Sequence, residues 1–409
     1  MTEIHSIKFD ASNMSAFGTL ETGELTPIVQ SDFVYGLNSQ IWQSGVVSGN
    51  GAIVDTNASR LRVQSGTGSS GYAYIQNRRP VRYRAGQGSV ARFTPLFTAG
   101  VVNNVQMWGM GAIAANVVYD GYFFGYNGTS FGIVHYVRGT PTWYAQTTDW
   151  NGDKVNGSAG SSFTWNPTLG SPVQIKYPYL GYGDIEFFVQ NPTTSRWVLV
   201  HVIRYANTVV TTQLSNPTMY FTGFTLNSGN TTNMIMYCAS VGVFISGERS
   251  FIGNPKWAVD SYKTGIGNTE TSLIGVRNCT TYNTVVNRGL IRLSSFSASS
   301  SANTTVFIRF KINATVSTTP SFTPVNGSTA DNGITITTGN SITSYDTTAT
   351  TVTGAGSYIY NFSLGSSSVG FIDLVPFGLF IAPTEILTVS GYGVGSTNIG
   401  LSLNFTEDI

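Results

Sequence analysis

The sequence predicts an all-β protein built from two antiparallel β-sandwiches, and three observations lead to this prediction. Thr, Val, Tyr and Phe are common whereas Ala, Leu, Glu and Lys are sparse, a composition that favours strands over helices. Aromatic residues make up 13% of the chain, which argues against the disorder that so much Ser, Thr and Gly could otherwise indicate. The length of 409 residues exceeds what one hydrophobic core usually spans, so we expect two domains.

Charge is scarce in this chain. Charged residues make up 10% of the sequence, well below the roughly 25% of an ordinary soluble domain. The formal net charge of +1 provides no broad field to attract nucleic acid or an anionic membrane. We therefore expect partners to be held by shape and hydrogen bonds, and we expect neither nucleic acid nor a membrane anchor among them.

Cysteine content and the N-terminal segment bear on the compartment. The two cysteines, Cys238 and Cys279, lie on either side of the expected domain junction. Two free thiols are favoured, and a single bridge between them stays open. The first residues lack the basic and apolar regions of a secretory signal, and no apolar run approaches the roughly 18 residues of a membrane span. We expect synthesis in the cytoplasm.

The chain begins with a segment of weak pattern. Residues 1–40 are expected to form an N-terminal arm that docks on its own core or on a neighbouring subunit, with a disordered tail as the alternative. The main sandwich is expected over residues 41–246. Its first strands are predicted near Ile53 and over residues 61–63, where apolar residues alternate with Arg62.

An arginine-rich run follows, with Arg78, Arg79, Arg82 and Arg84 within seven residues. Alternation with Val81 and its neighbours predicts a strand on which Arg82 and Arg84 share one face. A nucleic-acid patch is one interpretation. The favoured one is a set of arginines that pairs with carboxylates or stacks on rings, within the chain or across a subunit boundary. The four arginines are therefore candidate subunit contacts.

The stretch from 119 to 150 is predicted to organise the main sandwich. Strands are expected over residues 89–97 and 101–113 before it. Asn127-Gly128, between two aromatic and glycine-rich segments, is a strong hairpin signal. Its rings are expected mainly in the core, and an intersubunit surface or a carbohydrate-stacking platform remain alternatives. The candidate glycan or partner contacts are Tyr126, Trp143, Tyr144 and Trp150.

Further strands are predicted over residues 197–203, 217–226 and 234–245, and then the pattern weakens. His201 lies among valines and is predicted to be a core histidine. With His5 and His135 it shows no metal-ligand spacing, so neither a metal nor another cofactor is expected. Glycines interrupt residues 247–275, which are predicted to link the two domains.

The second domain is expected over residues 276–409. In residues 306–312 the apolar positions alternate with Arg309 and Lys311, which predicts a sheet with one solvated side. Ser/Thr-rich tracts at 295–305 and 315–353 are predicted to be long loops or edge strands. The apolar alternation over 399–409 predicts that the C-terminus is an ordered strand.

Several of these segments, in this order, resemble a family of structural proteins from tailed phages and large DNA viruses. The similar segments are residues 75–88, 92–94, 120–133, 149–157 and 174–187. The sequence departs from the family at residues 134–138, where an arginine pair often stands. The resemblance covers roughly residues 70–240 and implies a lectin-like sandwich within a virion. The C-terminal residues 383–409 resemble viral C-terminal modules, which implies a smaller jelly-roll-like sandwich.

The resemblance makes a non-enzymatic structural component of a virus particle the leading functional prediction. Its partners would be copies of itself and other capsid or tail proteins, and its position on shell, vertex or tail stays open. The alternative is a receptor-binding spike or tail protein that recognises a host cell-surface glycan. A polysaccharide hydrolase is the lesser alternative, because Asp184 and Glu186 would share one strand face. Without a stronger catalytic constellation, we do not expect an enzyme.

Overall fold

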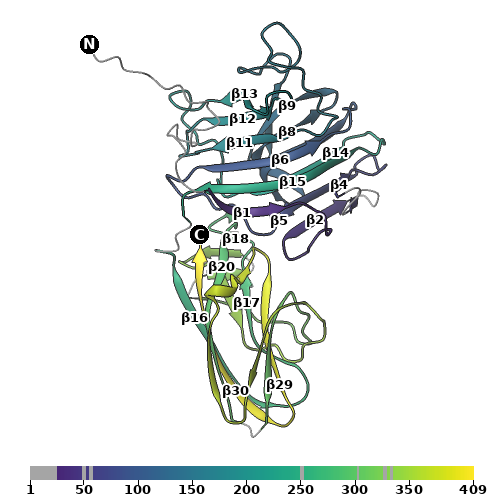
Figure 1. Cartoon of the computed structure of the whole chain (residues 1–409). Coiled ribbons are helices and arrows are strands. Elements are labelled where there is room, and N and C mark those ends of the chain that lie inside the picture. The colour runs from purple at the N-terminus through teal and green to yellow at the C-terminus, as the bar shows by residue number, and fades with distance from the viewer. Residues whose placement is uncertain are drawn as a thin grey trace, which may run out of the picture. The chain divides into compact units, whose positions relative to one another are not determined.

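A computed structural model describes residues 25–47, 52–54, 59–248, 253–301, 304–325, 329–331 and 335–409. The chain divides into two compact units, residues 1–250 and 251–409, and each consists of β-sheets (Figure 1). The all-β prediction is therefore confirmed. Within the described ranges, no helix is long and apolar enough to cross a membrane.

The first unit is a sandwich of two sheets. The eight-stranded sheet is ordered β13-β12-β11-β6-β15-β4-β3, with β1 paired to β15. Its strands are β1 (Leu25–Ser31), β3 (Ala52–Val54), β4 (Leu61–Gln64), β6 (Ser89–Leu96), β11 (Val173–Tyr177), β12 (Ile185–Gln190), β13 (Trp197–Ile203) and β15 (Ile235–Ser246).

The seven-stranded sheet is ordered β10-β9-β8-β7-β14-β5-β2 and is antiparallel throughout. Its strands are β2 (Trp42–Val47), β5 (Tyr72–Asn77), β7 (Asn104–Ala114), β8 (Val117–Asn127), β9 (Ser130–Val137), β10 (Thr140–Ala145) and β14 (Tyr220–Asn227).

Aromatic rings fill the space between these two sheets. Phe124 of β8 lies at the centre, with its ring centroid 5.8 Å from that of Trp165 and 5.4 Å from that of Phe187 on the opposite sheet. Phe131 packs edge-on against Trp165 at 5.0 Å. Alternate residues of β8 point into this core because successive side chains of a strand face opposite sides.

The hairpin predicted at Asn127-Gly128 is present as β8 and β9. Asn127 pairs with Ser130, so the two loop residues are Gly128 and Thr129, one position later than expected. Gly128 has a φ of +60°, which is the left-handed conformation that a two-residue hairpin loop requires and that glycine adopts without strain.

One expectation about the N-terminal half is corrected, namely the start of the main sandwich at residue 41. Residues 1–24 of the predicted arm lie outside the described residues, whereas residues 25–31 form β1, which pairs with β15. Val29 and Phe33 are buried in the core of the first unit. The sandwich therefore begins before residue 41.

The arginine run is not a strand. Strand β5 ends at Asn77, whose side chain accepts a hydrogen bond from the Phe221 amide at 2.6 Å and donates one to the Arg79 carbonyl. Pro80 then removes a backbone donor. In the connection to β6, the Val81–Met219 pair is an isolated bridge and not part of a strand, so the expected alternation of Arg82 and Arg84 on one strand face is wrong.

The second unit contains two larger sheets and a small one. The five-stranded sheet has the order β16-β30-β20-β27 with β28 paired to β20, and the six-stranded sheet has the order β22-β25-β17-β29-β21-β26. Their strands are β16 (Lys256–Ile266), β17 (Thr271–Asn278), β20 (Leu290–Ser300), β21 (Val306–Ile312), β22 (Thr323–Pro324), β25 (Thr343–Asp346), β26 (Ser357–Leu364), β27 (Val369–Asp373), β28 (Phe380–Ile381), β29 (Ile386–Gly393) and β30 (Thr397–Asp408).

The small four-stranded sheet and a short helix complete the second unit. The sheet comprises β18 (Thr281–Tyr282), β19 (Val285–Val286), β23 (Thr329–Asp331) and β24 (Thr335–Thr338), and the 3-10 helix η3 (Val375–Phe377) follows β27. The chain crosses repeatedly between the two larger sheets, so their facing sides enclose one core.

The predicted linker, residues 247–275, contains structure that belongs to the second unit. Strand β16 runs along β30, with Lys256 opposite Thr406 and Trp257 opposite Phe405. Gly265 has a φ of +69° and lies where the register shifts. The glycine that interrupts the apolar pattern therefore marks a β-bulge within a strand.

Two further expectations about the second unit are corrected. The Ser/Thr tract that begins at residue 295 continues β20, which lies between β30 and β27 inside the sheet. In β21 the apolar alternation is present, but the side opposite it is not simply solvated. Lys311 is buried, and its ammonium lies 2.7 Å from the Glu270 carboxylate. Arg309 also contacts Glu270, at 3.1 Å.

Both cysteines are free and buried. Cys238 lies on β15 in the first unit, and Cys279 follows β17 in the second. The favoured prediction of two free thiols is confirmed.

Candidate functional site

The outer face of the seven-stranded sheet, on the side away from the sandwich core, carries a second apolar cluster. We call it the aromatic face and define it by Tyr72, Tyr74, Phe123, Tyr136, Trp143 and Phe224. The strand register brings these residues together from distant parts of the sequence. One row across the sheet consists of Gly45, Tyr74, Phe224, Met107, Gly125, Gly132 and Ala145.

Three rings of the aromatic face form a stacked group at one side of the sheet. The ring centroid of Tyr72 lies 6.4 Å from that of Tyr74, with 14° between the planes. It also lies 6.1 Å from that of Phe224, with 24° between the planes. Since β5 and β14 are neighbouring strands, these near-parallel rings cover the sheet surface as one patch.

Glycines beneath the rings let them lie close to the backbone. A Cβ atom added at Gly45 would lie 2.4 Å from the Tyr74 ring, and one added at Gly111 would lie 2.2 Å from the Phe123 ring. Any larger residue at either position would push its ring away from the sheet. The glycine-rich composition of these strands therefore serves the placement of the rings.

Burial divides the aromatic face into an inner layer and an accessible one. Met107, Phe123 and Val134 are fully buried within it, at 0% exposure. Tyr74, Tyr136 and Trp143 are half-buried and pack over this layer. The distance from Tyr74 on β5 to Trp143 on β10 corresponds to five strand spacings, or about 24 Å.

The polar groups of the aromatic face are phenols that remain protonated. Burial raises the pKa of Tyr136 to about 12 and also raises the pKa of Tyr74. The Tyr72 hydroxyl is buried and has no hydrogen-bond partner. The half-buried Tyr74 and Tyr136 phenols can therefore donate a hydrogen bond to a ligand over the whole physiological pH range.

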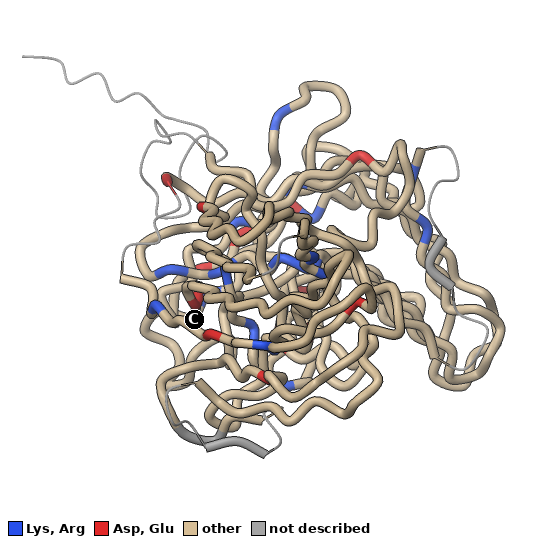
Figure 2. Tube along the Cα trace, turned by 90° about the horizontal axis from the view of Figure 1, so that it is seen from below, with Lys and Arg blue, Asp and Glu red and all other residues tan. Residues whose placement is uncertain are grey.

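The seven strands of this sheet carry a single carboxylate, Asp120, and its oxygens already accept hydrogen bonds from other parts of the chain. Asp120 is fully buried and accepts hydrogen bonds from the Ser215 hydroxyl at 2.6 Å, the Ser215 amide at 3.2 Å and the Arg138 amide at 3.3 Å. It therefore has a structural role between strand β8 and two loops. Figure 2 shows how few positions along the described part of the trace carry a charge.

The structure separates the four predicted glycan or partner contacts. Tyr126 and Trp150 are core residues, at 9% and 3% exposure, and Trp150 donates its indole N–H to the Tyr144 carbonyl at 3.0 Å. Their assignment to a binding platform is wrong, because their strand positions and loop point them inward. Tyr144 also packs on the core side, against His201 at 4.7 Å. Trp143 alone of the four belongs to the aromatic face.

The four arginines lie in the connection from β5 to β6. Arg78, Arg79, Arg82 and Arg84 are half-buried, and each takes part in at least one interaction within the chain. Arg78 donates to the Ser39 carbonyl at 3.0 Å. Interaction within the chain is one of the two roles predicted for these arginines, and a subunit contact remains a prediction.

Other residues singled out in the sequence have structural surroundings. Asp184 lies 3.8 Å from the Arg204 guanidinium, and Glu186 stands opposite Lys176 in the eight-stranded sheet. Burial raises the pKa of Glu186, which the Lys176 charge opposes. His201 is a core residue at 2% exposure, and burial lowers its pKa to about 4. Among the described residues, no group of three potential ligands could hold a metal.

No protein-family model matches this sequence, and no curated protein sequence matches it. Solved structures with a similar fold include the carbohydrate recognition domain of Emp47p, at 10% identity and a TM-score of 0.33 over 59% of this chain and 100% of that chain. Lectin II from Ulex europaeus is 10% identical, with a TM-score of 0.35 over 53% and 97%. The Bacillus licheniformis beta-glucanase is 14% identical, with a TM-score of 0.32 over 56% and 100%.

Sequence reasoning missed most of the aromatic face. Tyr72, Tyr74 and Phe224 were not singled out, although Tyr72-Ala73-Tyr74 alternates as a strand with one aromatic side does. The pairing of β5 with β14 could not be inferred, because nothing local in the sequence specifies which distant strands are neighbours.

Proposed function

We propose that this protein binds carbohydrate, without cleaving it, on the aromatic face of its first unit. The observation that carries the proposal is the layer of half-buried Tyr74, Tyr136 and Trp143 over fully buried apolar residues. The C–H side of a sugar ring is apolar and stacks on an aromatic ring, while phenol hydroxyls bond the sugar hydroxyls. The span of about 24 Å suits an oligosaccharide rather than a single sugar.

Binding is favoured over hydrolysis by the carboxylate content of the face. Glycosidic cleavage commonly uses two carboxyl groups about 5–10 Å apart. The described seven strands contribute only Asp120, which is buried and bonded to Ser215. Glu186 lies on β12 of the other sheet, and Asp184 directly precedes that strand, away from the rings that would hold the sugar.

The proposal is tested by a glycan array followed by titration calorimetry on the hits, using neutral oligosaccharides. Tyr74→Ala and Trp143→Ala are each expected to weaken binding about tenfold, since each removes one stacking surface. Tyr35→Ala is the matched control, because Tyr35 is 99% exposed and lies outside the face. Unchanged affinity in both face variants, with circular dichroism showing native folding, would contradict the proposal. Release of reducing sugar that is lost in Asp184→Ala would instead favour the hydrolase.

A place in a virus particle is a second proposal, supported by the sequence resemblance of residues 70–240 to phage and large-virus structural proteins. The two proposals are compatible if the protein lies on the particle surface. Cryo-electron microscopy of the intact particle distinguishes them, because a buried symmetric position would leave the aromatic face without access to a glycan. If the arginine run contacts a neighbouring copy, Arg82→Ala should weaken assembly while leaving the chain folded.

A further inference from the structure

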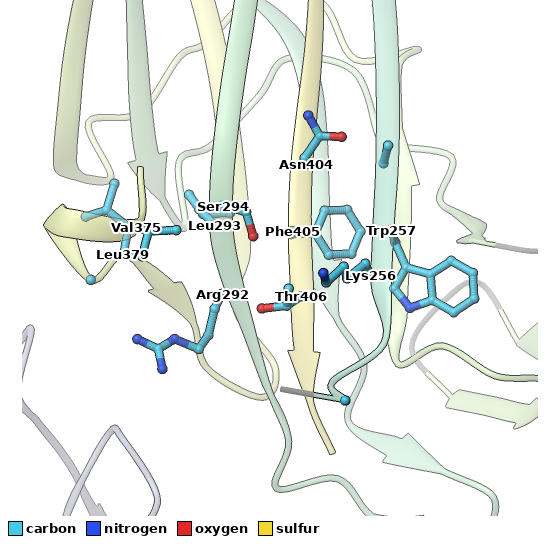
Figure 3. Close-up of a pocket in the computed structure, with 13 residues that line it drawn as sticks. Lys256, Trp257, Arg292, Leu293, Ser294, Val375, Leu379, Asn404, Phe405 and Thr406 are labelled. Atoms are coloured by element: carbon cyan, nitrogen blue, oxygen red, sulfur yellow. The ribbon is translucent and has the colours of Figure 1, made fainter. Parts of the chain in front are cut away.

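A groove of about 800 Å³ lies on the outer face of the five-stranded sheet in the second unit. Figure 3 shows Asn404 and Thr406 on the central strand β30, with Lys256 on β16 to one side and Arg292 and Ser294 on β20 to the other. Strand register explains the arrangement, because Thr406 pairs with both Arg292 and Lys256. The groove thus crosses three adjacent strands.

The charge of the groove has one sign. Of the 13 described residues that line it, Lys256 and Arg292 are cationic and none is Asp or Glu. Asp408 follows Thr406 on the same face of β30 but is 2% exposed and is not a lining residue. Arg292 already takes part in an interaction within the chain, but its guanidinium has five N–H donors. An anionic group in the groove would therefore meet the Lys256 ammonium and the remaining donors of Arg292, in a chain that has few charges of either sign.

The rest of the lining combines short polar side chains with an apolar wall. Ser294, Asn404 and Thr406 are half-buried on the floor, and Asn404 donates its amide to the Ser295 hydroxyl at 3.0 Å. This orients the Asn404 carbonyl oxygen as an available acceptor. Val375, which is the first residue of η3 and is 61% exposed, forms the wall together with Leu379. The hydroxyl and amide groups of the floor, together with the apolar wall, suit a ligand that has many hydroxyl groups and one apolar side.

The floor offers no free backbone edge. Strand β30 is hydrogen-bonded on one side to β16 and on the other to β20. An extended peptide usually gains affinity by adding a strand to an exposed edge, which this floor does not permit. A volume of about 800 Å³ also exceeds what a small inorganic anion fills.

We infer that this groove is a second binding site, specific for an acidic saccharide whose carboxylate lies between Lys256 and Arg292. The site goes beyond the carbohydrate binding proposed for the aromatic face, since it uses other residues, another unit and an anionic ligand. Either site can fail while the other functions.

The test is calorimetry on the full chain with a tetrasaccharide of alternating glucuronic acid and N-acetylglucosamine. Lys256→Ser is expected to weaken binding about fivefold, because it removes one exposed charge contact. Val375→Asp should weaken it similarly by placing a negative charge on the exposed wall, whereas its uncharged isostere Val375→Asn should stay within about twofold. Raising the salt concentration should reduce the affinity.

Three controls decide between outcomes. Arg196→Ser, at an exposed cation of the first unit, should leave the acidic tetrasaccharide bound as before. Equal weakening by Val375→Asp and Val375→Asn, or no binding at all, would overturn the inference. So would displacement of the saccharide by equimolar inorganic phosphate, or equally tight binding of a tetraglutamate peptide at the same residues.

Discussion

Removing one partner of the buried ion pair between Glu270 and Lys311 should strongly destabilise the second unit, and Glu270→Gln tests this. The Lys311 side chain is 3% exposed and that of Glu270 is 17% exposed, with 2.7 Å between ammonium and carboxylate. Ser390 donates a further hydrogen bond to Glu270 at 2.5 Å. Removing the carboxylate leaves the Lys311 ammonium buried without its counter-charge.

The magnitude follows from what remains around Lys311. Breaking a buried pair by removing one partner costs about 3–5 kcal/mol. The Tyr358 ring, 4.6 Å from the ammonium, still offers a cation–π contact of about 1 kcal/mol, and Glu270 is not fully buried. We therefore expect a loss of about 3 kcal/mol, which would lower the melting temperature of the second unit by about 6–12 °C.

Hydrogen exchange during urea unfolding, followed on peptides from β21 and β29, assigns the effect to the second unit. This choice matters because six of the seven tryptophans lie in the first unit and dominate fluorescence. Adding Lys311→Met should recover at least half of the lost stability, since the orphaned charge is then gone. A loss under about 1 kcal/mol in the single variant, or no recovery in the double variant, would refute the reasoning.

Three further predictions concern a glycine, the thiols and a buried carboxyl. Gly125→Val should prevent folding of the first unit, because even a Cβ there would lie 2.1 Å from the Gln106 carbonyl oxygen; circular dichroism checks this against Gly170→Val, where the space is open. Burial raises the pKa of both Cys238 and Cys279 to about 12, so a thiol reagent at pH 8 should label neither until denaturant is added, and rapid native labelling would contradict their burial. Burial also raises the pKa of Glu407, so its contribution to stability is present at low pH and is lost as pH rises through the folded-state pKa. The stability of Glu407→Gln relative to the natural chain should therefore improve from pH 4 to pH 8, and a flat difference in urea unfolding would count against this.

Glu270 should show the opposite pH dependence. Burial alone would raise its pKa, but hydrogen bonds from Lys311 and Ser390 and the nearby cationic charges outweigh burial and lower it. Its stabilisation is present above the unfolded-state pKa and is lost as pH falls through the folded-state pKa.

The sequence pattern correctly predicted strands whose formation depends on residues that are close together in the sequence. The alternation of residues 306–312 and the aromatic hairpin at 119–137 both specify strands, and both are present. The prediction of a strand over the arginine run was wrong because the Asn77 side chain and Pro80 end the strand. A strand end that depends on a side-chain hydrogen bond of this kind leaves no periodic signal in the sequence. Lys311 occupies the polar face that alternation assigns, but its partner Glu270 comes from a segment that was expected to be a linker.

The candidate sites depend on strand neighbours that are remote in sequence. Trp143 was identified because it stands in a conspicuous aromatic stretch, whereas Tyr72 and Phe224 acquire meaning only once β5 pairs with β14. The groove in the second unit likewise needs β16, β20 and β30 side by side. Residue types indicate what a surface could bind, and topology decides which residues share it.

Each unit joins its earliest described strand to its last one, and this arrangement governs the order of folding during synthesis. Strand β1 pairs with β15 in the first unit, and β16 pairs with β30 in the second. On the ribosome, β1 and β16 must each wait unpaired until nearly the whole of their unit has emerged. Such long-range closure is slow, and the waiting edges are open to wrong partners. The first unit can close before β30 is translated, so the nascent chain needs protection for one unfinished sandwich at a time.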